Sequence, residues 1–413
     1  MNANPAFLEG FLANTSSLTA EYLARGINAN VINHAFGQDL LSVLITNISP
    51  AAAAALASGV NQNVAANPAD NLLTGLLANT NGQAGIAIAT GLNNNPSFVR
   101  VLVENVTAPT AIAAANGINL SCQRAQTGTA EHPAEYYQFL RKLLANLGPA
   151  VAQASSEGLV NNPELQPLIS AMINSLNAAA VAPVIAAGLN GNPAVGNMIP
   201  DLLKTLDATT AHTIALALNA NPSMTSLLLK ELKPAFVAGL LKDNSLFLSG
   251  LISNLDGAVI ANALNAEYAM HTVSGVEHPE NSLLGRLFAS PDFNGADLAD
   301  LLDTAGYDFL VDLLANLDGA PIAQAINNAG QAFLTEFIAY LNPDLILNVI
   351  RADRDPVSPT GDGGGGIKDL NIKIYVYELA GLPIPLGDAE FKTLDVGIWI
   401  PPDLPPLVAN TPP

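Results

Sequence analysis

Two loops combine a histidine with carboxylates, the combination in this 413-residue chain that is best suited to bind a metal ion or to change charge near neutral pH. Both contain the tripeptide Glu-His-Pro followed by a further acid. The six candidate ligands are Glu131, His132 and Glu135 in the first loop and Glu277, His278 and Glu280 in the second. Each loop supplies only one histidine, whereas a zinc site needs three or four ligands. We therefore favour the alternative that each histidine replaces asparagine as a helix N-cap, with the acids near the positive end of the helix dipole.

Other groupings that could carry chemistry are weaker. The stretch between Leu287 and Ile350 is acidic and contains no Lys or Arg, but its spacing does not match a calcium-binding EF-hand loop, and a solvated acidic face is favoured. The single cysteine, Cys122, excludes an internal disulfide and a cysteine zinc cluster. No nucleophile elbow, phosphate-binding glycine loop or dinucleotide-binding fingerprint occurs. We expect no enzymatic activity and no cofactor.

The composition excludes several classes of partner and location. Fifteen Lys and Arg against 35 Asp and Glu give a net charge of −20, so we expect no nucleic-acid binding. No stretch reaches 18 apolar residues, and we expect no transmembrane segment. The first residues lack the basic region and apolar core of a signal peptide. The compartment stays open, and an extracellular or cell-surface location is favoured only if a leader was removed.

Internal repetition is the strongest signal, and it predicts the elements that must position any site. The segment LISNLDGAVIANALN (251–265) aligns without gaps to LLANLDGAPIAQAIN (313–327), with ten identities in fifteen. The unit reads as an apolar helix, a short break, and a second helix that closes on Asn-x-Asn or Asn-Asn. Residues 1–350 are therefore predicted to form an α-solenoid of about a dozen short helical hairpins. Irregular insertions interrupt it near residues 120–133 and 267–279.

Asparagine marks the junctions between these units. The junction residues are Asn30, Asn63, Asn95, Asn162, Asn192 and Asn221, and the long interval between the third and the fourth predicts one disguised junction. Asparagine tolerates the left-handed conformation at a helix C-terminus and can N-cap the next helix. We therefore expect most of the 42 asparagines to act as caps and turns.

The C-terminal segment differs from the repeat. Residues 351–366 read as a linker rich in Gly, Pro and Asp, and beyond them the hydrophobic period changes to two. Residues 367–413 are thus predicted to be β-rich, with two or three strands on an otherwise mostly α protein. A cap over the end of the solenoid is favoured, and a strand donated to a neighbouring subunit or docking on a membrane surface are the alternatives. The candidate interface residues are Ile372, Ile374, Tyr375, Val376, Tyr377, Ile398, Trp399 and Ile400.

The surface suggests what such an array does. Only 12% of residues are charged and half are hydrophobic, so much of the exterior is uncharged or apolar. Self-association into a filament, sheath or surface layer would bury such a surface, and we expect a non-catalytic structural or interaction protein of that kind, with its strand-forming tail linking copies. One alternative is a solenoid that holds a lipid or other hydrophobic ligand. Another is a monomeric scaffold that binds a protein on its concave face.

Overall fold

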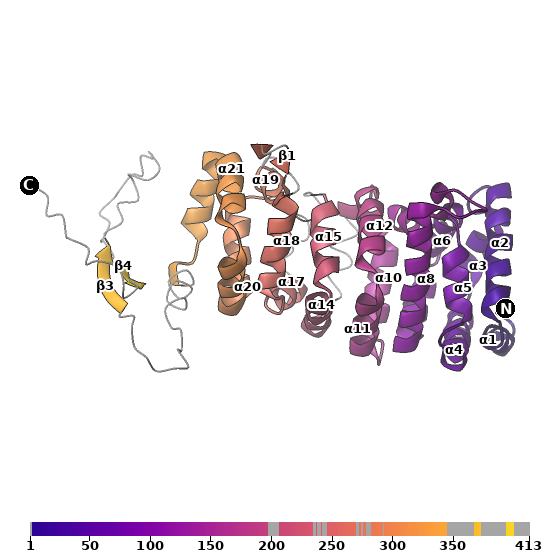
Figure 1. Cartoon of the computed structure of the whole chain (residues 1–413). Coiled ribbons are helices and arrows are strands. Elements are labelled where there is room, and N and C mark those ends of the chain that lie inside the picture. Colours follow the sequence, from indigo (N-terminus) through magenta and orange to yellow (C-terminus); the bar gives the residue numbers. More distant parts are fainter. Residues whose placement is uncertain are drawn as a thin grey trace, which may run out of the picture. The chain divides into compact units, whose positions relative to one another are not determined.

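The computed structural model describes residues 2–196, 206–233, 237, 241, 246–269, 272–273, 276–277, 282–291, 293–344, 367–372 and 394–399. The chain divides into two compact units, Met1–Leu341 and Asn342–Pro413. The first unit is mostly helical, and its helices follow one another in chain order from indigo to orange in Figure 1. The predicted helical repeat is therefore observed in this unit.

The helices of the first unit alternate between short and long. They are α1 (Pro5–Ala13), α2 (Ser17–Asn33), α3 (Leu40–Asn47), α4 (Pro50–Ala66), α5 (Leu72–Asn79), α6 (Gly82–Asn94), α7 (Pro96–Asn105), α8 (Ala108–Thr127), the 3₁₀ helix η1 (Ala134–Tyr137), α9 (Phe139–Asn146), α10 (Pro149–Val160), α11 (Leu165–Ser175), α12 (Ala178–Asn190), α14 (Ala208–Ala220), α15 (Pro222–Glu231), α17 (Leu246–Ile252), α18 (Gly257–Ala269), α19 (Leu283–Phe288), α20 (Gly295–Asn316) and α21 (Gly319–Tyr340). Gly306 and Gly330, with φ of 77° and 83°, divide α20 and α21 into two helices each.

Each repeat unit is a short helix joined to a longer one by a three-residue segment that we call the elbow. An elbow consists of the last residue of the short helix and two following residues, the first of them extended; at Thr80, for example, φ is −76° and ψ is 133°. The third residue often N-caps the long helix, as Asn81 does by accepting a hydrogen bond from the Ala84 N–H. Proline also occurs in the first turn of a long helix, as at Pro50, where its missing N–H costs no helical hydrogen bond.

The geometry of the elbow differs from the hairpin expected from the sequence. The two helices of a unit meet at 113° for α3 and α4, 117° for α7 and α8, and 105° for α11 and α12, rather than folding back antiparallel. Because the partners diverge, each helix packs instead on the helix three positions further along the chain. Such contacts join α1 to α4, α2 to α5, α3 to α6 and α4 to α7, and they continue along the array.

Small residues make this close packing possible. Alanines fill much of the core, and Ala53, Ala87, Ala182 and Ala211 have no exposed surface. Aliphatic clusters lie between successive helices, such as the one that surrounds Val181. The core is therefore a series of small contacts between neighbouring units, as in other repeat architectures.

The two predicted insertions have different structures. The first lies partly within α8, which continues to Thr127, so only residues 128–138 interrupt the α-helices, and they include η1. The second contains β1 (Thr272–Val273) and β2 (Val276–Glu277), which pair antiparallel. Both insertions follow a long helix, as the sequence indicated.

The second unit contains two described strands. Strand β3 (Ile367–Ile372) pairs antiparallel with β4 (Leu394–Trp399), and Ile367 lies opposite Trp399. Residues 345–366, 373–393 and 400–413 lie outside the described residues. The β-rich character of residues 367–413 as a whole, the linker, the expected third strand, and the role of this segment as a cap or strand donor therefore stay predictions.

Candidate functional site: the stitched array and its open end

A recurring pentapeptide near the end of the long helices joins successive units. It reads Gly-x-Asn-x-Asn at 26–30, 59–63, 91–95 and 188–192. Variants that keep one or both asparagines occur at 117–121, 158–162, 217–221 and 263–267. The pentapeptide glycine lies in the last turns of the long helix, and the final residue lies close to the helix end, as Asn95 does as the C-cap of α6.

The first asparagine of the pentapeptide contacts an elbow in the unit after next, and we call this contact the forward clamp. In α6, the Asn93 side-chain amide donates to the Asn146 carbonyl (2.8 Å), and the Gly148 N–H donates to Asn93 Oδ1 (2.8 Å). The amide thus pairs with both polar groups that the elbow leaves outside the helices. Seven forward clamps of the described chain make this pair of bonds: Asn28, Asn61, Asn93, Asn119, Asn190, Asn219 and Asn265. Asn2, which precedes α1 and lies outside any pentapeptide, makes the same pair of bonds with the elbow 47–49 of the next unit.

The second asparagine contacts the elbow of the preceding unit, and we call this contact the backward clamp. Asn192 donates to the Leu144 carbonyl (2.7 Å) and to the Leu147 carbonyl (2.9 Å). The residues that make this contact are Asn63, Asn95, Asn162, Asn192 and Asn221. One Asn-x-Asn sequence therefore links its own unit to the preceding unit and to the unit after next.

These contacts correct the role that the sequence assigned to asparagine. The positive φ angles of the described residues occur at four glycines, and the junction residues Asn95 and Asn221 have φ of −140° and −124°. The expected left-handed C-caps are therefore wrong, although Asn221 does N-cap the following helix. The disguised junction lies at Asn119 and Ser121, where serine replaces the second asparagine and its buried hydroxyl has no hydrogen-bond partner.

The glycine of the pentapeptide packs closely against the short helix of the preceding unit, and we call it the seating glycine. A Cβ built on Gly59 would lie 2.5 Å from the Glu9 carbonyl oxygen, and one on Gly158 would lie 2.4 Å from the Arg100 carbonyl oxygen. Gly91, Gly117 and Gly188 make similarly close approaches, at 2.7–2.8 Å. Real Cβ atoms are not found at such distances, so the packing requires glycine.

The first repeat unit, formed by α1 and α2, has the same glycine, asparagine and elbow, but no preceding unit contacts them. A Cβ on Gly26 would meet nothing within 4 Å, and within the described residues no carbonyl accepts a bond from the Asn30 amide, whose Oδ1 is held by the Leu40 N–H (2.8 Å). The elbow 14–16 has no forward clamp on it, since the described hydrogen bonds include none to the Asn14 carbonyl or from the Ser16 N–H.

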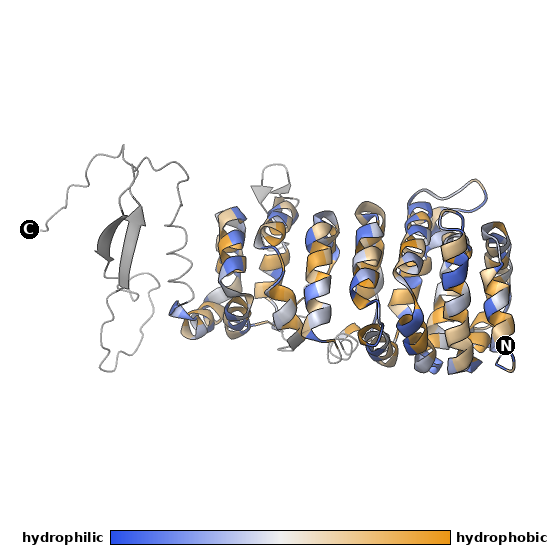
Figure 2. Ribbon diagram, turned by 90° about the horizontal axis from the view of Figure 1, so that it is seen from below, coloured by the Kyte–Doolittle hydropathy of each residue, from blue (hydrophilic) through white to orange (hydrophobic). Residues whose placement is uncertain are grey.

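Exposed apolar side chains surround this open end. Ten of the 17 large hydrophobic side chains that are exposed in the described residues lie in the first 44 residues, and Figure 2 shows hydrophobic residues on the helices next to the N-terminus. The ten are Phe7, Phe11, Leu18, Tyr22, Leu23, Ile32, Phe36, Leu40, Val43 and Leu44. We call this surface of α1–α3 the N-terminal end face.

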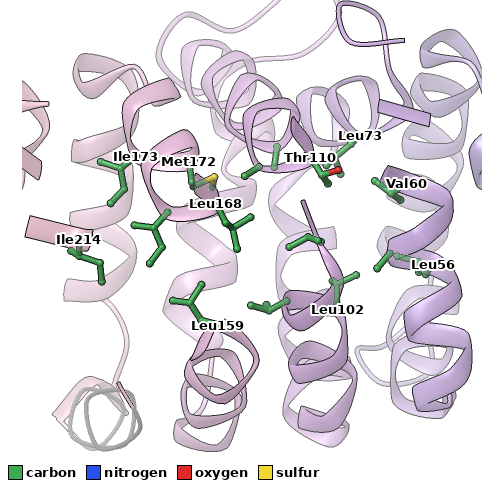
Figure 3. A pocket seen from close by; sticks show the side chains of 16 residues that line it. Leu56, Val60, Leu73, Leu102, Thr110, Leu159, Leu168, Met172, Ile173 and Ile214 are labelled. Carbon is green, nitrogen blue, oxygen red and sulfur yellow. The ribbon is translucent and has the colours of Figure 1, made fainter. Parts of the chain in front are cut away.

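A second site is an apolar pocket of about 550 Å³ between α4, α5, α7, α8, α10, α11 and α14. Figure 3 shows side chains from these helices around a common space. The lining residues are Leu56, Ala57, Val60, Leu73, Leu102, Val103, Val106, Thr110, Ala111, Ala114, Leu159, Leu168, Ile169, Met172, Ile173 and Ile214. Thr110 alone has a polar side chain, and its hydroxyl lies 2.6 Å from Asn61 Oδ1. The pocket therefore offers a ligand almost purely aliphatic contacts.

The predicted histidine loops are only partly described. In the first loop, Glu131 forms an ion pair with Arg25 (3.2 Å), Glu135 is exposed, and the His132 ring stacks on Tyr136 at 4.0 Å. The residue before η1 is Pro133, which has no side-chain cap, so the expected N-cap role of His132 is wrong because stacking holds its ring.

The second histidine loop is described only at its strands. Glu277 lies in β2, whereas His278 and Glu280 lie outside the described residues. Among the residues that the structure describes, no three metal-binding side chains come together. Asp297 of the acidic stretch caps its own helix through a capping box with Asn294.

Of the remaining predicted residues, Cys122 is buried, three lie in strands, and the others lie outside the described residues. Burial raises the pKa of the Cys122 thiol to about 12. Of the predicted C-terminal interface, Ile372 lies in β3, and Ile398 and Trp399 lie in β4. The others, Ile374, Tyr375, Val376, Tyr377 and Ile400, lie outside the described residues.

No protein-family model, curated protein or solved structure matches this chain. Within the described part of the chain, no single helix combines the length and apolar character needed to cross a membrane, although four bent helix pairs do so jointly by length and composition. The open N-terminal end, the clamps and the apolar pocket are the structural features that bear on function.

Proposed function

We propose that the protein is a non-catalytic structural subunit that self-associates, as in a filament, sheath or surface layer. The observation that carries this proposal is the N-terminal end face, where Gly26, Asn30 and the elbow 14–16 lack the neighbour that equivalent positions contact elsewhere. An exposed cluster of large apolar side chains marks an interaction surface on a soluble protein. A face built to pack on a repeat unit is best covered by another repeat unit.

The composition supports the same proposal. Only 15 residues are Lys or Arg, so few long cationic side chains lose rotamer entropy when two surfaces meet. Lysine is also depleted in the interfaces of protein complexes.

The experiment is light scattering after size exclusion at several concentrations, with negative-stain images of the same fractions. We expect the mass to rise with concentration in steps of 42.6 kDa. The double variant Phe7→Glu/Phe11→Glu removes two stacked, exposed rings from the end face and should reduce the assembled fraction at least tenfold. Leu216→Glu, at an exposed position of α14, is the matched control. A wild-type protein that stays at 42.6 kDa at every concentration contradicts the proposal.

A deletion of residues 367–413 separates two routes of self-association. If the strand-forming tail links copies, the deletion abolishes assembly. If the N-terminal end face links them, the truncated protein still assembles and the phenylalanine variant still does not.

The apolar pocket favours a second candidate function, the binding of a lipid or other aliphatic ligand. Its volume of about 550 Å³ lies within the range of small-molecule sites, and its lining matches an alkyl chain. Organic extraction of the purified protein should release a stoichiometric lipid, and a fluorescent fatty acid should bind.

A pocket variant tests this second function. Met172→Trp fills the space with an indole and should weaken binding of the fatty acid at least tenfold, whereas Leu216→Trp on the exposed side of α14 should not. A clean extract together with unchanged binding by Met172→Trp excludes this function.

A further inference from the structure

We infer that copies of this chain add head to tail, with α21 of one copy stitched to α1 and α2 of the next in the register of the internal units. This inference rests on the proposed self-association and specifies its partner and geometry. It follows from features at the C-terminal end of the helical array that match, position by position, those missing at the N-terminal end face.

The second half of α21, residues 331–340, has the form of a short helix that ends in an elbow. It begins after Gly330, and its C-cap Leu341 has φ of −61° and ψ of 129°. The elbow residues Leu147 and Leu176 have nearly the same angles, −70° and 140° and −73° and 133°. Tyr340 therefore corresponds to the first residue of an elbow.

A fixed register relates each seating glycine to the short helix it receives. Gly59 meets Glu9 and Leu12, which lie five and two positions before the first elbow residue, Asn14. Gly158 meets Arg100 and Val103 in the same register, and Gly91, Gly117 and Gly188 follow the same rule.

The register assigns a partner to Gly26. In α21 the two positions are Thr335 and Ile338, and Ile338 is 50% exposed although it is a large aliphatic residue. Gly26 is thus a seating glycine with no short helix packed on it, and Ile338 is an exposed side chain at the position that seating glycines contact. In the proposed contact, Ile338 of one copy packs on Gly26 of the next.

The clamps match in the same register. Asn327 aligns with the forward clamp Asn265 in the sequence repeat, but it is exposed and has no hydrogen-bond partner within the described residues. Forward clamps reach an elbow in the unit after next, and counted across two copies that elbow is 14–16 of the following chain. The Asn327 amide then donates to the Asn14 carbonyl, and the Ser16 N–H donates to Asn327 Oδ1.

The backward clamp of Asn30 also has partners in α21 and its C-cap. Asn30 takes the position of Asn95, which donates to the carbonyls of Ile45 and Ile48, at positions two before and one after the first elbow residue. Across the proposed contact, the corresponding carbonyls are those of Ile338 and Leu341 of the preceding copy. Every unsatisfied feature of the N-terminal end face thus has a counterpart in α21.

A second pair of glycines supports the register independently. Gly75 and Gly250 each lie four positions before the first residue of an elbow. They contact Ser17 and Ala208, which are the first residues of long helices. The corresponding pair across two copies is Gly10 and Gly319. Neither has any atom within 4 Å of an added Cβ, as expected of a crossing that only a second copy completes.

Chemical cross-linking between two cysteine variants tests the contact directly, with the cysteines beside the seating glycine because a side chain at Gly26 would block the contact. Chains with Asn30→Cys are mixed with chains with Leu341→Cys and treated with a short bismaleimide, and the native Cys122 does not interfere because it is buried. We expect a cross-linked heterodimer in the mixture and at least tenfold less dimer from either variant alone. Ala179→Cys, at an exposed position of α12, replaces Asn30→Cys in the control and should not cross-link.

Two point variants test the same contact without cross-linking. Gly26→Leu should raise the concentration needed for assembly at least tenfold, and Asn327→Ala should raise it severalfold, while Ala179→Leu and Asn328→Ala should not. The midpoint temperature of unfolding of the dilute protein should not fall in either test variant, because a Cβ on Gly26 meets no atom within 4 Å and Asn327 is exposed. Gly26→Leu retains its C-terminal end, so it should also terminate wild-type assemblies when added in small amounts.

The outcomes separate the inference from the proposed function. Assembly of the wild type together with no cross-link and no effect of either variant overturns the head-to-tail register and leaves self-association intact. An Asn30→Cys chain that cross-links to itself overturns the register in favour of a symmetric contact. A wild type that is monomeric at every concentration overturns both proposals.

Discussion

At the scale of single residues, the side-chain amide explains why asparagine is so frequent. An amide carries a donor and an acceptor at the spacing of a peptide group, so it can pair with the carbonyl and the N–H that an elbow exposes. Serine at the backward-clamp position is too short to reach the elbow, and the buried hydroxyl of Ser121 has no hydrogen-bond partner. An acid would present two acceptors to the two carbonyls of a backward clamp.

A buried backward clamp gives the clearest stability test. Asn63 donates to the carbonyls of Leu12, Ala13 and Thr15 and accepts from the Leu72 N–H, and only 1% of its surface is exposed. Asn63→Ala leaves these groups unpaired and should lower the free energy of unfolding by about 2–3 kcal/mol. Chemical denaturation measures this change, and Asn67→Ala, at an exposed position, is the control.

The charged analogue of the same variant adds a dependence on pH. Asn63→Asp places a carboxylate against three carbonyl oxygens, which raises the pKa of that carboxyl above its unfolded value. A raised folded pKa means that stability is greatest below the unfolded pKa and falls as pH rises. Denaturation of Asn63→Asp between pH 4 and 8 should therefore show decreasing stability relative to Asn63→Ala; the opposite trend would contradict the clamp.

The buried thiol predicts an alkaline effect. Burial raises the pKa of Cys122 from 9.0 to about 12, so the folded protein keeps its proton where the unfolded chain loses it. The contribution is intact below pH 9 and falls between pH 9 and 12, by at most about 1.4 kcal/mol per pH unit. Comparison with Cys122→Ala across this range isolates the effect. Alkylation of the native protein at pH 8 as fast as that of the unfolded chain would contradict the burial.

At the scale of elements, the elbow determines how units pack. A bend of 105–117° separates the two helices of a unit, so neither can bury its apolar face on the other. Both faces are covered by helices three positions away, which makes each unit dependent on its neighbours on both sides. The seating glycines allow those helices to approach closely.

Alanine at two glycine positions should have opposite effects. Gly158→Ala forces a methyl group to within 2.4 Å of the Arg100 carbonyl oxygen and should destabilise the protein by about 2 kcal/mol or more. Gly26→Ala meets no atom within 4 Å and should stabilise a dilute monomer by up to about 1 kcal/mol through helix propensity. Thermal and chemical unfolding of both variants measure the difference. A similar change in both would mean that Gly158 is not a seat.

At the scale of the whole molecule, charge opposes association and apolar contact favours it. The net charge of −20 makes any two copies repel one another at long range. Repulsion between exposed charges is screened beyond about 10 Å at 0.1 M salt, whereas the glycine seats and clamps act at contact distance.

Salt should therefore promote self-association. Raising the NaCl concentration from about 0.01 M to about 0.15 M should lower the concentration needed for assembly, measured by light scattering at constant pH. Assemblies that dissociate as salt is added would indicate that ion pairs hold the copies together, in contradiction to a stitched apolar interface. The Phe7→Glu/Phe11→Glu variant serves as the control and should show no assembly at either salt concentration.

The sequence by itself determined the helical repeat, the places where units end and the asparagines at the junctions. Those features depend on local signals: apolar spacing within a helix, Pro in the first turn, and side chains that cap the next helix. The repeated Gly-x-Asn-x-Asn spacing was also readable, but it did not reveal which residues each amide would meet.

The tertiary structure alone decided the bend at the elbow, the partners of the clamps, the apolar pocket and the open end. The forward clamps join residues between 35 and 58 positions apart, a separation that no short-range pattern specifies. Asn30 and Asn63 look identical in the sequence, yet only Asn63 contacts a preceding elbow. The difference arises because these hydrogen bonds depend on where neighbouring units lie in space, while local sequence determines only how each unit begins and ends.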